Sequence, residues 1–178
     1  ANTPDVGVLF HACWRAGAVA TPAIFLLPPS ELRHILTDAE ASTVVVGPEF
    51  LANVQQAAEG LDVRIILAGD GVDGLTTVDE LATTDPHPVV DRADDDLAAL
   101  LYTGGTTGRA KGVMLSHDNF MSNSMTALVN LGIREHSVHL HVSPLFHVAG
   151  GSRVFTTTVA GGTHAVIPRF EPELFLQA

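Results

Sequence analysis

Hydrophobic positions in the first 70 residues alternate between helical and strand-like spacing. Apolar residues recur at intervals of three and four from Pro4 to Arg15, which predicts a helix, and the run GAVATPAI from Gly17 predicts a short strand. The next cycle starts at Ser30, a predicted N-cap, and ends in the β-branched strand TVVV. A third cycle follows, with FLANVQQAAEG as helix and VRIILAG as strand.

Helix and strand pairs in succession are typical of parallel sheets covered by helices. We therefore predict an α/β fold with layered, mostly parallel sheets flanked by helices.

The region around residues 70–96 breaks this pattern. It is rich in Gly, Pro and Asp, which predicts a surface connection between two subdomains, with one helical turn near residues 78–81. Three adjacent carboxylates at 94–96 do not share one side of a strand or helix, so we predict a solvated loop there and no metal site.

The second half resumes the alternation with a buried strand, LAALLYT, followed by TGGTTGRAKG at residues 103–112, which we call the glycine loop. GVMLS then predicts a strand, and Ser116 is expected to cap a helix that ends at Gly132. Met121, Met125 and Leu128, with Phe120, Ala127 and Leu131 beside them, form a broad apolar face of that helix, for which we predict core packing. VHLHVSP, HVAGGSRVFTTTVAGG and THAVI predict a strand, a helix and a strand, and FEPELFLQA begins another helix.

Charge and composition narrow the classes of function. The chain has 178 residues, 46% of them hydrophobic, which suffices for a buried core, and its net charge is -11. An acidic chain repels phosphate backbones and anionic membranes, so nucleic acid is not an expected partner. Any bound anion must be held by local geometry.

Cysteine usage and hydropathy bear on location. Cys13 is the only cysteine, which excludes an intrachain disulfide and is compatible with a reducing compartment. No apolar run reaches the roughly 18 residues of a membrane span, and the first residues lack a signal-peptide pattern. We expect a cytoplasmic protein without a membrane span.

The glycine loop carries the strongest chemical signal. A glycine turn alone is as often structural as functional. Here glycines that allow close approach of backbone N–H groups alternate with hydroxyl donors and two cations, directly after a buried strand. The residues concerned are Thr103, Gly104, Gly105, Thr106, Thr107, Gly108, Arg109 and Lys111. The pattern predicts a polyphosphate cradle.

Two familiar nucleotide motifs do not fit. The Walker pattern needs Gly-Lys followed by Ser or Thr, but Lys111 follows Ala110 and precedes Gly112. A dinucleotide-binding G-x-G-x-x-G that opens a helix is also missing from the sequence.

The stretch LLYTGGTTGRAKGVMLSH instead resembles the phosphate-loop signature of the adenylate-forming enzymes, which include acyl-CoA synthetases, luciferases and peptide-synthetase adenylation domains. VSPLFHVAGG is similar to a downstream motif of that superfamily, and RAGAVATPAIFLLPPSELRHILTDAEASTVVV to its upstream region. The resemblance covers nearly the whole chain. It implies that residues 1–178 are a fragment of the large N-terminal, AMP-binding domain of an acyl-CoA synthetase.

The resemblance also implies a chemistry. Thr103, Gly104, Gly105, Thr106, Thr107, Gly108 and Lys111 would hold the β and γ phosphates of ATP, with Mg²⁺ bound at Thr103. A carboxylic acid, by expectation a fatty acid, would attack the α phosphorus to give an acyl-adenylate and pyrophosphate. Coenzyme A would then displace AMP.

Two loop residues depart from the family pattern. Gly104 stands where the family usually has Ser or Thr, which removes a hydroxyl donor, and Ala110 stands where it usually has Pro, which loosens the loop.

His147 in PLFHVAGG matches a position that lies near the acyl carboxylate and adenylate in acyl- and aryl-CoA ligases. The resemblance favours a catalytic role for it, and the alternative is a hydrogen-bonded core histidine. Gly150 and Gly151 either admit the acyl group or serve close packing. His139 and His141 would share one face of a strand near His136, but no Cys or carboxylate cluster beside them supports a metal site.

Later family motifs, including the lysine that assists adenylation, lie outside this sequence, so we expect the fragment alone to be inactive. The alternative function is a noncatalytic module for nucleotide binding or protein association. Apolar edges of a truncated sheet would favour self-association.

Overall fold

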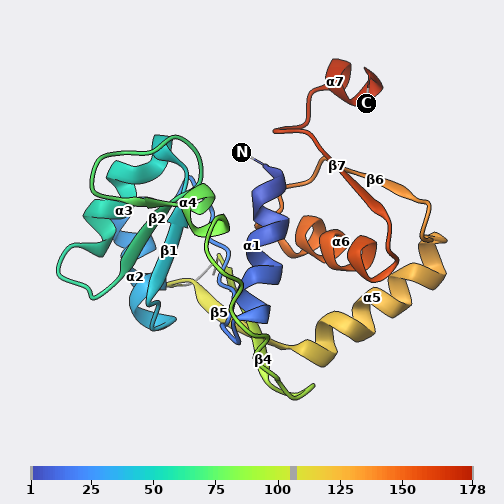
Figure 1. Cartoon of the computed structure of the whole chain (residues 1–178), viewed down its shortest axis with the longest axis horizontal. Coiled ribbons are helices and arrows are strands. Elements are labelled where there is room, and N and C mark those ends of the chain that lie inside the picture. Colours follow the sequence, from blue (N-terminus) through green and yellow to red (C-terminus); the bar gives the residue numbers. More distant parts are fainter. Residues whose placement is uncertain (1, 105–107, 178) are drawn as a thin grey trace. The chain divides into compact units, whose positions relative to one another are not determined.

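The computed structural model describes residues 2–104 and 108–177, and in it the chain divides into two compact units. The first unit combines residues 1–22, 88–101 and 113–178, and the second combines residues 23–87 and 102–112. Both are built from small sheets and flanking helices (Figure 1), which confirms the predicted α/β class. The expected connection at residues 70–96 contains the passage from the second unit to the first, between His87 and Pro88.

The second unit contains a three-stranded parallel sheet in the order β1-β2-β3. Its strands are β1 (Thr43–Val46), β2 (Arg64–Leu67) and β3 (Thr76–Thr77). Its helices are α2 (Pro29–Asp38), η1 (Pro48–Phe50), α3 (Leu51–Ala58) and α4 (Val78–Ala82). The short strand β3 was not predicted, because its two threonines are too few to show a period.

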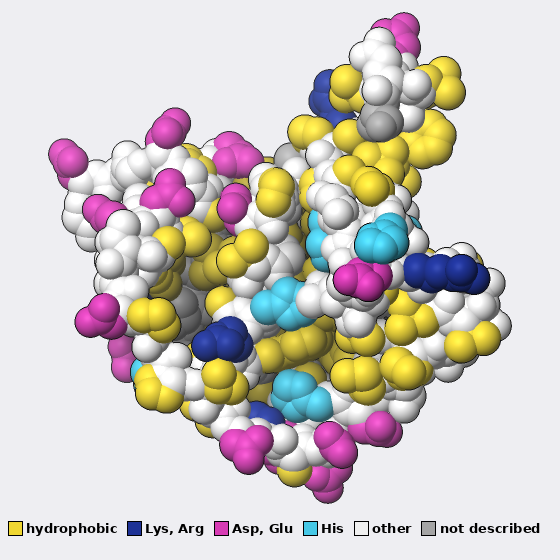
Figure 2. Space-filling view, turned by 45° about the vertical axis from the view of Figure 1, so that its right-hand side comes forward, with side chains coloured by type: hydrophobic (Ala, Val, Ile, Leu, Met, Phe, Trp, Pro, Cys, Tyr) yellow, Lys and Arg dark blue, Asp and Glu magenta, His cyan; other side chains and the backbone are white. Residues whose placement is uncertain are grey.

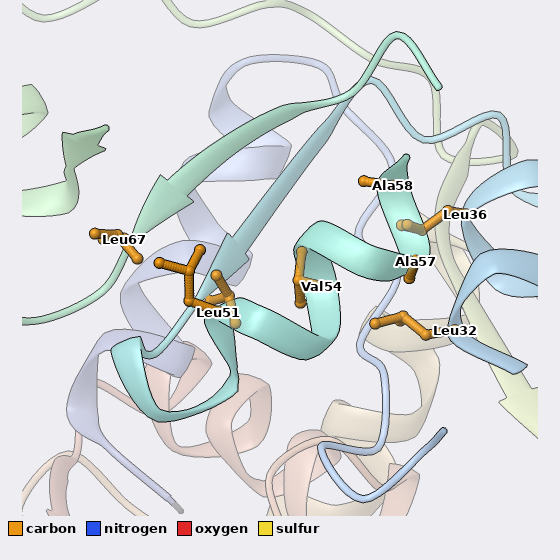
Figure 3. Close-up of a cluster of buried hydrophobic side chains, with 8 residues drawn as sticks. Leu32, Leu36, Leu51, Val54, Ala57, Ala58 and Leu67 are labelled. Atoms are coloured by element: carbon orange, nitrogen blue, oxygen red, sulfur yellow. The ribbon is translucent and has the colours of Figure 1, made fainter. Parts of the chain in front are cut away.

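The core of the second unit lies between α2, α3 and the sheet (Figure 3). Leu67 and Ala57 are fully buried. The other members of the cluster are Leu32, Leu36, Val46, Leu51, Val54 and Ala58. Burial of this apolar surface fixes α2 against α3.

The first unit holds the parallel pair β6 (Val138–His141) and β7 (Thr163–Val166), which is packed against α6 (Val148–Val159). It also contains most of β4 (Leu97–Thr103) and β5 (Lys111–Ser116), which form a two-stranded sheet. Its other helices are α1 (Pro4–Arg15), α5 (His117–Leu131) and α7 (Pro172–Gln177).

An aromatic cluster forms the core between α1, α5 and α6. Trp14 stacks on Phe155 with ring centroids 4.4 Å apart, and Phe120 meets Phe155 edge-on at 4.7 Å. The Trp14 indole N–H donates to the carbonyl of Ala98 at 2.9 Å, which satisfies its only polar group and ties α1 to β4.

The ends of α5 agree with the sequence. Ser116 accepts a hydrogen bond from the backbone of Asn119, whose side chain accepts one from the Ser116 backbone, so a capping box starts the helix. Gly132 ends it with φ of 64°, a left-handed conformation that favours glycine.

Two expectations from the sequence were wrong. The segment predicted as a strand from Gly17 contributes only one bridge, between Ala20 and Ala99, because Gly17 has a φ of 69° and Pro22 lacks an N–H. Met121 and Met125 were assigned to the core but are about half exposed, at 51% and 52%. The buried face of α5 is formed by Phe120 and Ala127, which belong to the predicted apolar face, and by Ser124, which does not.

Acidic side chains are spread over the face shown in Figure 2, and apolar side chains also reach that surface. None of the helices within the described ranges is both long and apolar enough to cross a membrane.

Candidate functional site

Strand β4 carries the chain from the core to the glycine loop. Ala98 and Ala99 are completely buried, the following three residues are half-buried, and Thr103 is exposed. The strand therefore anchors the loop at one end and leaves Thr103, the first hydroxyl residue of the loop, exposed to solvent. Gly105, Thr106 and Thr107 lie outside the described residues, so the prediction for them stays a prediction.

Two of the loop's described glycines have open space around them. A Cβ built on Gly104 or Gly108 would meet no atom of residues 2–104 and 108–177 within 4 Å, and neither residue has a left-handed backbone. Among the described residues, neither packing nor backbone conformation requires glycine at these two positions. The predicted reason for glycine here, close approach of a ligand to the peptide groups, stays a prediction.

Lys111 supplies a localised positive charge at the end of the loop. It is the only lysine in the sequence, its side chain is exposed, and it forms no ion pair with any side chain in the described ranges. Arg109 is exposed as well. The chain as a whole has a net charge of -11, but Arg109 and Lys111 give this segment a local positive charge. This charge favours the binding of anions.

The loop ends are held by residues that sequence reasoning missed. Tyr102 donates its hydroxyl proton to Asp38 Oδ2 at 2.6 Å, and His34 Nε2 lies 3.0 Å from the carbonyl oxygen of Ala110. His34 and Asp38 are four residues apart on α2, which places them on one face of that helix. The four-residue spacing of His34 and Asp38 could be read from the sequence, but their partners Ala110 and Tyr102 could not.

His147 lies in the first unit, at the N-cap of α6, and is exposed rather than buried in the core. Its Nδ1 accepts a hydrogen bond from the backbone N–H of Ala149 at 3.2 Å. Because Nδ1 is an acceptor, the neutral ring carries its proton on Nε2. His147 thus presents an N–H donor that no other described residue uses.

A small open hollow adjoins His147. It has about 210 Å³ of empty space, including the solvent at its mouth. Its lining is mainly apolar, with Phe10, Phe120 and Phe155 from three helices, and His147 and Ser152 contribute polar groups. The hollow lies wholly within the first unit.

Gly150 and Gly151 serve close packing. A Cβ on Gly150 would lie 2.3 Å from the carbonyl oxygen of Pro144, and one on Gly151 would lie 2.9 Å from that of Leu145. The start of α6 therefore rests directly on the backbone that leads to His147. That backbone is anchored in turn by the buried Asn2, which bonds the N–H of Leu145 and the carbonyl of Ser143, both at 3.0 Å.

Histidines in the first unit form a hydrogen-bonded chain. Thr158 donates its hydroxyl proton to Val154, so it accepts from the Nε2–H groups of His11 at 3.1 Å and His164 at 3.2 Å. His164 Nδ1 is then the acceptor for His141 Nε2–H at 2.9 Å. Burial, followed by the charges of His139 and His164, lowers the pKa of His141 to about 4. No three potential metal ligands converge anywhere in the described ranges.

The structure thus shows a strand of the first unit that continues into a glycine-rich, cationic loop of the second unit, and an exposed imidazole beside an apolar hollow within the first unit. These features define an α/β protein with a glycine-rich, cationic loop after a buried strand.

Comparison with known proteins assigns the family. All 178 residues match the AMP-binding enzyme family, and the chain belongs to it. The chain is 36% identical over 178 residues to a feruloyl-CoA synthase from Amycolatopsis, covering 99% of this chain and 34% of that protein.

Solved structures agree. ATP-bound MatB from Rhodopseudomonas palustris superimposes with a TM-score of 0.88 at 35% identity, covering 99% of this chain and 35% of that one. The long-chain-fatty-acid-CoA ligase FadD1 from Archaeoglobus fulgidus gives a TM-score of 0.87 at 30% identity, covering 99% of this chain and 35% of that one. The chain therefore spans about a third of the length of these relatives.

Proposed function

We propose that this chain is the ATP-phosphate-binding part of the N-terminal domain of an adenylate-forming acyl-CoA ligase. The reaction joins a carboxylic acid to AMP with release of pyrophosphate, and coenzyme A then takes the acyl group and releases AMP. The observation that carries the proposal is the exposed loop, in a chain that matches the family from end to end. Within the described part of the chain, Gly104 and Gly108 have open space around them and Lys111 forms no ion pair.

The loop would act on the leaving pyrophosphate. Lys111 and the hydroxyl of Thr103 are exposed where the strand ends, and the peptide groups of Gly104 and Gly108 are open to approach. Such groups neutralise negative charge that grows on the β and γ phosphates as the bond to the α phosphorus breaks. Gly105, Thr106 and Thr107 complete the proposed set.

Magnesium fits this site as an ion that arrives with ATP. The described residues offer no group of three ligands, but Thr103 presents one hydroxyl oxygen at the loop. Mg²⁺ commonly takes one or two protein oxygens and completes its coordination with phosphate oxygens and water. When bound, it would supply charge neutralisation on the phosphates.

His147 would orient the carboxylate. Its Nδ1 is held by Ala149, which fixes the ring and leaves the Nε2–H as a donor to a carboxylate oxygen or to the acyl-adenylate. The apolar lining beside it favours an aliphatic or aromatic acyl group, and we place fatty acids among the proposed substrates. Relatives are named for feruloyl and for long-chain fatty acyl substrates.

The single lysine gives a direct test of the loop. An amine-selective acylating reagent should modify Lys111 in the free chain, and saturating Mg-ATP should protect it while the α-amino group, followed by mass spectrometry, remains reactive. Lys111→Ala should weaken Mg-ATP binding by about 10-fold or more in calorimetry. Arg64→Ala, which removes an equal charge from the exposed first residue of β2, should leave binding unchanged. Equal reactivity of Lys111 with and without nucleotide contradicts the proposal.

Catalysis needs a protein of the relatives' length that contains these residues. Pyrophosphate release should then depend on a carboxylic acid from a panel of aliphatic and aromatic acids, and acyl-CoA should form only when coenzyme A is added. Nucleotide binding without pyrophosphate release for any acid would favour the noncatalytic alternative.

Protein association is a second candidate, favoured by one observation. Met121, Met125 and Val129 lie four residues apart along α5 and are 51%, 52% and 82% exposed. This apolar stripe is suited to contact with another protein surface. Sedimentation of the chain and of Met125→Glu tests self-association, because a charge in the stripe should lower the association state.

A further inference from the structure

We propose that helix α2 positions the glycine loop, with His34 and Asp38 as positioning residues that hold its two ends from one face of one helix. The inference rests on the proposed function, since it concerns how the loop is prepared for phosphate binding. It assigns a role to residues that lie about 70 positions away in the sequence.

The first contact fixes the entrance of the loop. Tyr102 immediately precedes Thr103, and its hydroxyl donates to Asp38 at 2.6 Å. The same ring lies against the exit strand, since a Cβ on Gly112 would meet the Tyr102 Cζ at 3.2 Å. Glycine at position 112 thus allows the two ends of the loop to approach each other. The pKa of Tyr102 is raised to about 12, first by burial and then by the bond and the charge of Asp38.

The second contact fixes the exit. A carbonyl oxygen only accepts, so His34 Nε2 must be the donor to Ala110 at 3.0 Å. The bond forms with either the neutral Nε2–H ring or the cation. His34 also meets the Tyr102 ring edge-on at 6.4 Å, which links the two contacts. The held carbonyl belongs to the residue next to Lys111, so the bond restrains the start of that lysine's strand.

The helix itself is firmly seated. Leu32, Ile35 and Leu36 bury its apolar face, with Leu32 and Leu36 in the core of the second unit. Arg33 bonds the carbonyls of Ala57 at 3.0 Å and Glu59 at 2.6 Å. A loop whose ends are fixed by such a support loses less conformational freedom when it binds phosphate, and this strengthens binding without any direct contact between α2 and the ligand.

Matched variants test the inference through the dissociation constant of Mg-ATP. His34→Leu and Asp38→Ala should each weaken binding by about 3- to 10-fold. His34→Gln and Asp38→Asn keep a donor and an acceptor in place and should restore near-normal affinity. Arg33→Met removes two structural bonds from the same helix without touching the loop, so it should lower the urea midpoint and leave the dissociation constant unchanged.

The single tyrosine provides a signature of the contact itself. Tyrosinate absorbance reports Tyr102 alone, and its midpoint should fall from about 12 when Asp38 is replaced by Asn. Because this pKa is raised in the folded chain, the stabilisation is full below about pH 10 and is lost as the pH rises toward 12.

The outcomes separate the two proposals. If Lys111→Ala weakens binding but His34→Leu and Asp38→Ala do not, the proposed function stands and the inference is overturned. Equal weakening in Arg33→Met and His34→Leu also overturns it, because the effect is then general destabilisation. If the unmodified chain does not bind Mg-ATP while its tyrosinate midpoint stays near 12, both the proposed function and the inference about α2 are overturned, even though the contact between Tyr102 and Asp38 is present.

Discussion

The glycine loop and the first turn of helix α6 are both glycine-rich, but they use glycine in opposite ways. Gly104 and Gly108 have empty space where a side chain would be, whereas Gly150 and Gly151 lie against backbone carbonyls. Residues Tyr102 and Ala110 of the loop region bond to α2, whereas the first turn of α6 lies on the backbone of Pro144 and Leu145, next to residues bonded by Asn2. Gly104 and Gly108 are therefore open to approach among the described residues, and Gly150 and Gly151 are committed to the fold.

The largest expected effect is a loss of stability at the first turn of α6. Gly150→Ala should lower the free energy of unfolding by about 3 kcal/mol, because its Cβ would overlap the Pro144 carbonyl and the helix cannot withdraw without losing its packing. Gly104→Ala should change stability by less than about 0.5 kcal/mol. Urea denaturation of both variants measures the difference, and equal losses would contradict the comparison.

Acid should destabilise the first unit around His141 before it affects the glycine loop. The lowered pKa of His141 means that the folded state binds protons less readily than the unfolded one, so its stabilisation is full above about pH 6.5 and is lost as the pH falls toward 4. We expect a loss on the order of 2 kcal/mol over that window. The groups around it are His139, His164, His11 and, through its charge on His139, Arg153.

Denaturation at several pH values, compared with His141→Asn, measures this dependence. The variant should flatten the profile between pH 6.5 and 4, and an unchanged slope would show that other groups control acid sensitivity.

His147 is expected to have two separable roles. His147→Ala removes the cap of α6 and should cost about 1 kcal/mol of stability, whereas His147→Asn keeps a capping side chain and should cost little. If the imidazole orients the acyl carboxylate, both variants should slow acyl-adenylate formation in a protein of the relatives' length. Normal activity in His147→Asn would assign His147 to capping alone.

The smallest effect concerns the loop's departure from its family. Gly104→Ser should fit without strain and restore a hydroxyl donor, so Mg-ATP binding should tighten by a few-fold while stability stays constant. Calorimetry of this variant beside Gly104→Ala separates the added hydroxyl from the added Cβ. Equal affinities would mean that the hydroxyl does not reach the phosphates.

Features that depend on a few neighbouring residues could be predicted from the sequence. Ser116 and Gly132 bound α5 through local hydrogen bonding and backbone conformation, and the β-branched run at Thr43–Val46 forms β1. Met121 and Met125 were misassigned because helical spacing identifies an apolar face but not what covers it.

The support of the glycine loop was beyond local reasoning for a different reason. His34 bonds a carbonyl 76 residues away, and any residue can supply a carbonyl, so no side-chain pattern marks the partner. The glycine loop could be predicted as a phosphate site because the residues that suggest this chemistry lie in ten consecutive positions, 103 to 112.

The indole of Trp14 has a consequence for observing the protein. It is the only tryptophan, and its N–H is bonded to Ala98 in the strand that leads to the glycine loop. Its emission therefore reports the polarity and order at the root of that strand, without a label and without interference from a second indole. If the emission shifts when nucleotide is added, binding can be followed by the intrinsic fluorescence of Trp14.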